Sequence, residues 1–359
     1  MKVQCICPIG IGNYLMCYPA FHFLKKKKPD CSLHLIALRH SIGALAQGDP
    51  LWDSIETFDP DKIKRDVKKG ISIIARLRAM HCDASLCFFP SNTWQYFSVP
   101  FLSGISRRYA FKYDKKKFSS LSFLCNNPLK VDLGLHDIDQ NIKLVEFFLQ
   151  ENYTEAQKVF PKQYDDADLA WATAYCESEA PGKRRIAVHP GSSVEHGMDV
   201  KRWSADRFGL LCDKICKKMS AHAFVLGSPD EDELKRAMAQ SMKENAHIVE
   251  TVSIKKTAAL LSQCSLALCN DSGIMHMAAC LDIPTIGIFG PTDEKRNGPY
   301  GKKNIVVRKP MQGFPLWTAA NVGDRGIAIG IDPKASLNAL TVDDAWDQIE
   351  PWLEKIVCN

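Results

Sequence analysis

Short apolar runs alternate with longer segments of helical periodicity along nearly the whole chain. In the first half this pattern predicts strands at residues 3–7, 32–38, 54–59, 83–89 and 107–113, and helices at residues 14–26, 62–80, 94–101 and 136–150. In the second half it predicts strand segments at 186–191, 222–229, near 248, 265–270 and 285–289, and helices at 167–178, 205–219, 230–243, 254–262 and after Gly273. Such alternation is typical of an α/β fold with parallel sheets. We expect residues 107–113 to be the last strand of the first sheet.

The chain is long enough for two domains. At 359 residues it exceeds the roughly 250–300 residues at which a single hydrophobic core stops growing. The polar stretch 151–168 is the predicted linker. We therefore predict an N-terminal domain at 1–165 and a C-terminal domain at 166–340, and we expect residues 341–359 to form a helix that packs back on the N-terminal domain.

Each predicted strand of the second half ends in a polar turn. These turns are Pro190–Ser193, Gly227–Glu231, Asp271–Gly273 and Gly290–Asp293. Because the carboxyl ends of parallel strands meet at one edge of a sheet, we expect the turns to converge on a single crevice. That edge is where α/β sheets bind ligands.

The turn at Asp271 begins a helix and has the composition of an anion site. Ser272 is placed to cap the helix, and Gly273 lets a ligand approach the backbone. The free amides of a helix N-terminus attract phosphate. His276 follows about one turn later as a further donor. The alternatives are a capped helix start without a ligand and an ordinary helix histidine.

For two charged residues in or near these turns, both a ligand-binding role and an ordinary structural role are open. Lys201 can reach back over the crevice to neutralise a diphosphate, or it is a solvated surface lysine. Glu231 can accept hydrogen bonds from ribose hydroxyls, or it complements a helix dipole in a first turn. The N-terminal turn with Gly10 and Gly12 either cradles a phosphate or is a tight turn without one.

The amino-acid composition indicates the class of protein and its cellular location. Hydrophobic residues make up 46% and charged residues 24% of the chain, as in globular proteins. We find neither a run of roughly 18 apolar residues nor a signal peptide, and we expect a cytoplasmic protein. The fourteen cysteines lie in apolar segments without a Cys-x-x-Cys pair, so we predict buried thiols and no metal site.

The net charge of +5 is modest, and lysines gather at residues 25–28 and 115–117. The first group lies at a predicted helix C-terminus, where the dipole favours cations. Solvated surface is one explanation, and attraction to an anionic lipid or acceptor is the other. Basic and aromatic residues do not alternate as they do in single-strand binders, so we predict no nucleic-acid partner.

Five stretches, taken together, resemble the ADP-heptose:lipopolysaccharide heptosyltransferases, glycosyltransferase family 9. They are GIGNYLMCYPAF at 10–21, PGSSVEHGMDVKRWSADRF at 190–208, VLGSPDEDE at 225–233, NDSGIMHMAACLDIPTIGIFGPTD at 270–293 and GPYG at 298–301. The resemblance implies a GT-B fold, in which two Rossmann-like domains with parallel sheets face each other across a cleft. It also implies that a sugar is transferred with inversion, without a metal or other cofactor, from a nucleotide-diphosphate donor to a glycan or lipid-linked acceptor.

The resemblance assigns roles to matching positions. Lys201 contacts the donor phosphate or sugar, Glu231 binds the ribose, and Asp271 meets the sugar. The expected donor-binding set is Ser192, Lys201, Glu231, Asp271, Ser272, Gly273, His276, Gly290 and Thr292. Gly12 and Asn13 are expected to bind the acceptor, and the expected catalytic residues are Asn13, Lys201, Asp271 and His276. An acceptor on a lipid implies peripheral contact with the inner face of the inner membrane.

Two positions depart from the family pattern. Asn13 stands where members usually carry the aspartate presumed to be the general base, and an amide does not accept a proton at neutral pH. Another group serves as base, with His196, Asp199 and Glu195 as candidates, or the acceptor differs, or the protein turns over weakly. The tail 311–332 lacks the family's cysteine-bearing segment, which leaves the sugar and acceptor open.

The sequence thus predicts a metal-independent inverting glycosyltransferase, with ADP-heptose as a possible donor. Two alternatives come from other classes. One is a nucleotide-sugar-binding protein with little turnover, because of Asn13. The other is a nicotinamide-dependent oxidoreductase, although neither half opens with a complete G-x-G-x-x-G.

Overall fold

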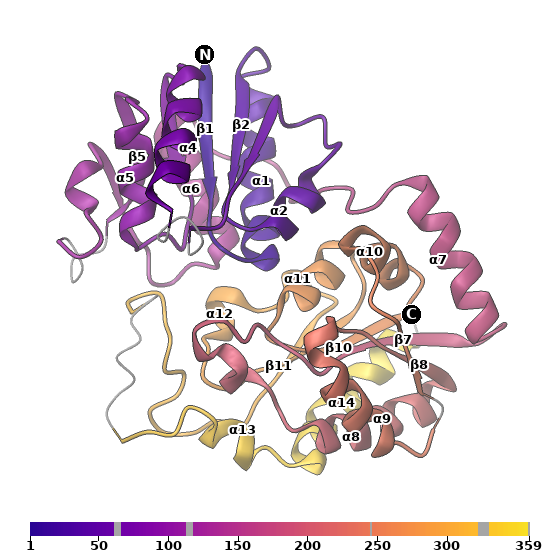
Figure 1. The fold of residues 1–359 in the computed structure, drawn as a ribbon. Coiled ribbons are helices and arrows are strands. Elements are labelled where there is room, and N and C mark those ends of the chain that lie inside the picture. The colour runs from indigo at the N-terminus through magenta and orange to yellow at the C-terminus, as the bar shows by residue number, and fades with distance from the viewer. Residues whose placement is uncertain (61–65, 113–117, 245, 322–329, 358–359) are drawn as a thin grey trace. The chain divides into compact units, whose positions relative to one another are not determined.

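The computed structural model describes residues 1–60, 66–112, 118–244, 246–321 and 330–357. The chain forms two compact units, shown in Figure 1. The first comprises Met1–Pro161 and a short segment that begins at Ala319, and the second begins at Lys162 and includes the C-terminus. Each unit has a parallel six-stranded sheet, as expected for the GT-B type of α/β fold.

The sheet of the first unit has the strand order β3-β2-β1-β4-β5-β6. Its strands are β1 (Lys2–Cys7), β2 (Ser32–Ala37), β3 (Ser54–Thr57), β4 (Ala84–Cys87), β5 (Arg107–Lys112) and β6 (Asn127–Lys130). The prediction that 107–113 would be the last strand is therefore wrong, because β6 pairs beyond β5. This edge strand has four half-exposed or exposed residues and contains Pro128, so it lacks the apolar run of a central strand.

The helices of the first unit are α1 (Ile11–Lys27), α2 (His40–Ala46), α4 (Val67–Ala79), α5 (Trp94–Leu102) and α6 (Asp137–Leu149). α1 is apolar almost all round, because it packs on both the sheet and α6. The seven-residue α2 was not predicted. Residues 61–65 of the predicted basic helix and the lysines at 115–117 lie outside the described residues.

The sheet of the second unit has the order β12-β11-β10-β7-β8-β9, all parallel. Its strands are β7 (Arg184–His189), β8 (Ala221–Val225), β9 (Ala246–Ile248), β10 (Leu266–Asn270), β11 (Thr285–Ile288) and β12 (Ile305–Val307). Its helices are α7 (Asp166–Glu179), α8 (Ala205–Met219), α9 (Asp232–Gln240), α10 (Ile254–Ser262), α11 (Gly273–Cys280), α12 (Glu294–Asn297), α13 (Ala335–Ala339) and α14 (Val342–Val357).

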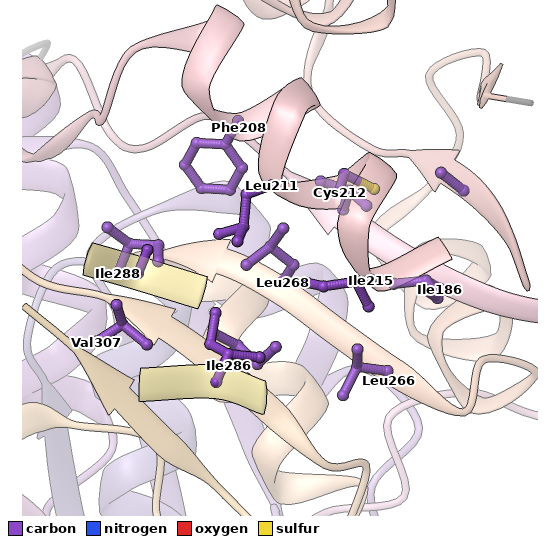
Figure 2. Close-up of a cluster of buried hydrophobic side chains, with 14 of the residues drawn as sticks. Ile186, Phe208, Leu211, Cys212, Ile215, Leu266, Leu268, Ile286, Ile288 and Val307 are labelled. Atoms are coloured by element: carbon purple, nitrogen blue, oxygen red, sulfur yellow. The ribbon is translucent and has the colours of Figure 1, made fainter. Parts of the chain in front are cut away.

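The core of this unit forms between the sheet and α8. In Figure 2 the side chains of Phe208, Leu211 and Ile215 project from α8 toward those of the sheet strands. Leu268 on the central strand β10 pairs with Val188 on one side and Ile286 on the other. Removing this apolar surface from water is worth about 25 cal/mol per Å², so the core fixes the strand register on which the turns depend.

The C-terminal helix belongs to the second unit. The prediction that it packs back on the N-terminal domain is wrong, because Ala345, Ile349 and Leu353 are buried in the same core as α8. Lys218 on α8 adds ion pairs of 3.1 Å to Glu350 and 2.8 Å to Glu354. The apolar stripe of this helix is satisfied within its own unit.

Two further findings concern the whole described part. Across those residues we find no helix with both the length and the apolar character needed to cross a membrane. The cysteines described there are unpaired thiols, most of them buried.

Candidate functional site

The four polar turns of the second unit follow four neighbouring strands. In the order β11-β10-β7-β8, the strands end at Ile288, Asn270, His189 and Val225. Because the strands are parallel, the turns lie at one edge of the sheet, which confirms the predicted convergence. The side chains that follow these ends form a network of buried charges.

Asn270 fixes the first turn to the central strand. Its side chain is fully buried, accepts a hydrogen bond from the amide of Trp203 at 3.1 Å and donates to the carbonyl of Pro190 at 2.7 Å. Trp203 is itself buried and donates through its indole to the carbonyl of Leu340. The chain segment that carries Lys201 is therefore fixed to the central strand at Trp203, two residues after the lysine.

Lys201 and Asp271 form a buried ion pair. Lys201 ends the short 3-10 helix Glu195–Lys201, and its Nζ lies 3.2 Å from Oδ2 of Asp271. The two side chains are 14% and 4% exposed, so a solvated surface lysine is excluded. The amide of Asn297 lies 3.4 Å from both oxygens of the same carboxylate.

Burial and the neighbouring polar groups have opposite effects on the pKa of Asp271. Burial is the largest single influence and raises the pKa of this carboxyl, whereas electrostatic interactions with Lys201 and His276 lower it. The hydrogen bond from Lys201 and the nearby Thr292 hydroxyl add to this lowering, and together these influences bring the pKa below its ordinary value. Asp271 is therefore a carboxylate at neutral pH, with its negative charge balanced by Lys201.

The carboxylate of Glu231 accepts hydrogen bonds from three neighbouring residues. Arg202 donates to Oε1 at 2.9 Å, while Nε2 of His189 at 3.3 Å and the amide of Ser228 at 2.9 Å bind Oε2. Burial raises the pKa of Glu231, but the hydrogen bond from His189, the Ser228 amide and the charge of Arg202 lower it to about 2. A Cβ on Gly191 would lie 1.9 Å from Oε1, so only glycine leaves room for this carboxylate.

Ser272 caps α11 as predicted. Its hydroxyl accepts a hydrogen bond from the amide of Met275 at 3.4 Å, and α11 begins at Gly273. His276 on the same helix is 5% exposed. The first turn of this helix thus places backbone amides beside the ion pair of Lys201 and Asp271.

The other predicted donor-site residues lie at the same edge. Ser192 accepts a hydrogen bond from Nε of Arg202 at 3.3 Å, and Thr292 is buried against Asp271. Gly290 has a packing role, because a Cβ there would lie 2.5 Å from Cγ of Leu337. We therefore find the expected set assembled in one unit, with Gly290 lining the contact to α13.

Sequence reasoning missed four members of this network, which are His189, Arg202, Asn270 and Asn297. His189 and Asn270 are the last residues of their strands, and a polar side chain at the end of a buried parallel strand is a signal that was available. Arg202 and Asn297 carry no such signal, because their partners come from turns distant in the sequence.

Gly12 and Asn13 lie in the first unit, at the start of α1. Asn13 is partly exposed, and its side-chain amide donates to the carbonyl of Ile9. Among the alternative bases, Asp199 lies 3.9 Å from Nζ of Lys334. The side chains of Glu195 and His196 lie outside the described part of the structure. Among the described residues, we find no group of three His, Cys, Asp or Glu side chains that could hold a metal ion.

Comparison with known proteins finds relatives among the heptosyltransferases. The model of glycosyltransferase family 9 (heptosyltransferase) matches residues 76–317. The lipopolysaccharide heptosyltransferase 1 of Campylobacter coli is 24% identical over 316 residues, which cover 86% of this chain and 89% of that protein. The lipooligosaccharide heptosyltransferase 2 of Campylobacter jejuni is 32% identical over 130 residues, covering 35% of this chain and 40% of that protein.

Solved structures share the fold over the full length. A family 9 glycosyltransferase from Veillonella parvula has a TM-score of 0.78 at 15% identity, covering 99% of this chain and 97% of its own. Escherichia coli heptosyltransferase WaaC, solved with ADP, has a TM-score of 0.72 at 15% identity, covering 99% and 100%. Neither alternative raised by the sequence, a binding protein without turnover or an oxidoreductase, is supported by these matches.

Proposed function

Because this chain belongs to glycosyltransferase family 9, the heptosyltransferase family, and is therefore a glycosyltransferase, we propose that it transfers heptose from ADP-heptose to a lipopolysaccharide-type acceptor. The proposal rests on the group of Lys201, Asp271 and His276 at the N-terminus of α11. In WaaC, a structural neighbour, ADP and a fluorinated ADP-heptose have been captured in crystal structures. The donor is held by the second unit and the acceptor by the first.

The donor diphosphate binds at the start of α11. Amides of the first helical turn, the Lys201 ammonium and the His276 ring would act on a group that gains negative charge as the glycosidic bond to phosphate breaks. Such preorganised donors stabilise a leaving diphosphate without a bound cation. Lys201 and His276 are therefore the residues on which we expect departure of the nucleotide to depend most.

Asp271 binds the sugar of the donor, and Glu231 binds its ribose. Asp271 stays ionised beside Lys201 and accepts hydrogen bonds from sugar hydroxyls, while Glu231 does the same for the ribose. Ser192, Gly290 and Thr292 border the site from the neighbouring turns. Since its carboxylate is already held by His189, Arg202 and Ser228, Glu231 presents a fixed acceptor to a ligand.

The acceptor hydroxyl is positioned by Gly12 and Asn13. An amide can orient this hydroxyl but does not take its proton at neutral pH, so a different group accepts the proton in this chain. We place the reaction in the cytoplasm, with the enzyme at the inner face of the inner membrane when its acceptor is a lipid. That contact is peripheral.

Calorimetric titration with ADP, UDP, GDP and ADP-heptose tests the donor. We expect ADP and ADP-heptose to bind, UDP and GDP to bind at least about tenfold more weakly, and Lys201→Ala to weaken ADP binding. Product formation from ADP-heptose with a lipid A-type acceptor, followed by mass spectrometry, tests the reaction. Absence of binding by every nucleotide at millimolar concentration would overturn the proposal.

A further inference from the structure

His189 joins two parts of the site that lie in different turns. It is the last residue of β7, and its ring is almost fully buried. Its Nδ1 lies 3.0 Å from the hydroxyl of Ser272 at the cap of α11, and its Nε2 lies 3.3 Å from Oε2 of Glu231. One ring thus contacts both the helix terminus and the carboxylate.

The partners of the ring determine its hydrogen-bond directions. Glu231 is ionised and accepts only, so Nε2 carries the hydrogen that is donated to it. In a neutral ring, Nδ1 is then an acceptor, and the Ser272 hydroxyl donates to it. Ser272 in turn accepts from the Met275 amide at 3.4 Å. The bonds run in one direction from the amide through serine and histidine to the carboxylate, and each group is satisfied.

We propose that His189 is a positioning residue that couples the phosphate-binding end of the donor site to its ribose-binding end. The inference rests on the proposed function, because it assigns Ser272 and Glu231 to those two ends. His189 touches neither the phosphates nor the sugar itself. It fixes the relative positions of the α11 cap and the Glu231 carboxylate, so the distance between the two subsites matches a single nucleotide.

The same network predicts how Ser272 contributes. Its hydroxyl hydrogen is committed to His189, so the serine offers a phosphate its backbone amide and not its hydroxyl. The anion is bound by amides of the helix start, where the macrodipole adds to each hydrogen bond. Arg202 has a parallel task for the neighbouring turn, because it binds both Glu231 and Ser192.

Three substitutions separate the two contacts of the ring. In His189→Asn the amide oxygen falls near the position of Nδ1 and keeps the Ser272 contact, whereas in His189→Gln the amide nitrogen falls near Nε2 and keeps the Glu231 contact. His189→Leu removes both contacts. His222→Gln on β8 is the control, since His222 belongs to the same sheet but lies at the opposite end of its strand. Circular dichroism verifies that each variant is folded.

The readout is the affinity for ADP and AMP measured by calorimetry. We expect His189→Leu to weaken ADP about tenfold, as for loss of one hydrogen bond to a charged group. His189→Asn, which releases the ribose end, weakens ADP and AMP equally. His189→Gln, which releases the helix cap, weakens ADP more than AMP. Wild-type affinity in folded His189→Leu would overturn the proposal, as would the same ADP-to-AMP ratio in all three variants.

A second measurement needs no ligand. In ¹⁵N-histidine-labelled protein at neutral pH, we expect His189 to show a protonated Nε2 and an unprotonated Nδ1, and the opposite tautomer contradicts the network. This result also separates two failures. If no nucleotide binds the wild type, the proposed function is wrong even when the tautomer is as expected. If ADP binds but the tautomer or the variants disagree, only the role of His189 is wrong.

Discussion

At the scale of single residues, the two carboxylates of the site differ in what surrounds them. Glu231 is bound by histidine, arginine and a backbone amide of its own unit, whereas Asp271 faces Lys201 and His276, which are assigned to the donor. Removing one partner of a buried pair leaves an uncompensated charge and costs about 3–5 kcal/mol. The two carboxylates therefore respond differently to substitution.

Lys201→Ala tests whether this lysine acts in catalysis as well as in folding. We expect turnover to fall roughly a hundredfold, as when one donor to a developing anion is removed, and the same for His276→Ala. The thermal midpoint also falls, because Asp271 loses its partner. In Lys201→Ala/Asp271→Asn the midpoint recovers but turnover does not. Recovery of both properties would mean that Lys201 only neutralises Asp271.

Glu231 makes stability depend on pH. Its pKa is about 2 in the folded protein against an ordinary value of 4.5, so the stabilisation is fully present above pH 4.5 and is lost as the pH falls toward 2. We expect the difference in thermal midpoint between wild type and Glu231→Gln to be constant near neutrality and to shrink below pH 4.5. The exposed Glu233→Gln is the control, and a difference as large at pH 3 as at neutral pH would contradict the assignment.

The sequence revealed residues of the polar turns and missed residues whose roles depend on contacts between turns. Lys201, Asp271 and Ser272 were predicted from turns at strand ends and from the family motifs, and the structure brings them to one edge. His189 and Arg202 were not, because their roles depend on contacts across turns that are 42 and 29 residues away in the sequence. The position of His189 at the end of a strand was visible in the sequence, but its pairing with Glu231 was not.

At the scale of elements, most helices followed from periodicity and capping. Predicted bounds agree with the structure for α8 and α10, where an apolar stripe follows a serine just before the first turn. The misses are short or polar elements, such as α2 and β6, whose four to seven residues are too few for a period to emerge. Their existence is decided by pairing and packing with the rest of the sheet.

Gly191 shows how a turn and a side chain depend on each other. A Cβ at this position would lie 1.9 Å from Oε1 of Glu231, and the carboxylate has no freedom to move without breaking its bonds to His189 and Arg202. We expect Gly191→Ala to cost about 1–3 kcal/mol in unfolding free energy and to weaken ADP binding.

A double-mutant cycle tests the cause of that cost. In a Glu231→Ala background the clash is absent, so we expect the further change Gly191→Ala to cost less than about 0.5 kcal/mol. Denaturant unfolding of the four proteins supplies the coupling energy. Gly134→Ala is the control, since its nearest foreign atom would be at an ordinary 3.6 Å. Equal costs in both backgrounds would place the strain in the backbone of the turn instead.

At the scale of the whole molecule, the chain has two units, each with its own six-stranded parallel sheet. The sequence predicted two α/β halves, because the alternation of strands and helices restarts after the polar stretch near residue 160. It misplaced α14, because an amphipathic helix at the end of a chain does not indicate which core it covers. The charged network around Asp271 and Glu231 lies within the second unit, whereas Asn13 lies in the first.

Asn13 is the residue that we propose to orient the acceptor hydroxyl. Its amide donates to the carbonyl of Ile9, so an aspartate there has no hydrogen to give and turns away from that carbonyl. We expect Asn13→Asp to raise turnover by about a hundredfold, the lower range for a positioned base, and to add a limb that rises with pH through the carboxylate pKa. Asn13→Ala, the control, lowers turnover without adding this limb. If Asn13→Asp changes neither the rate nor the pH profile while donor affinity stays normal, the side chain at position 13 does not reach the acceptor hydroxyl, and the assignment of Asn13 to the acceptor site is wrong.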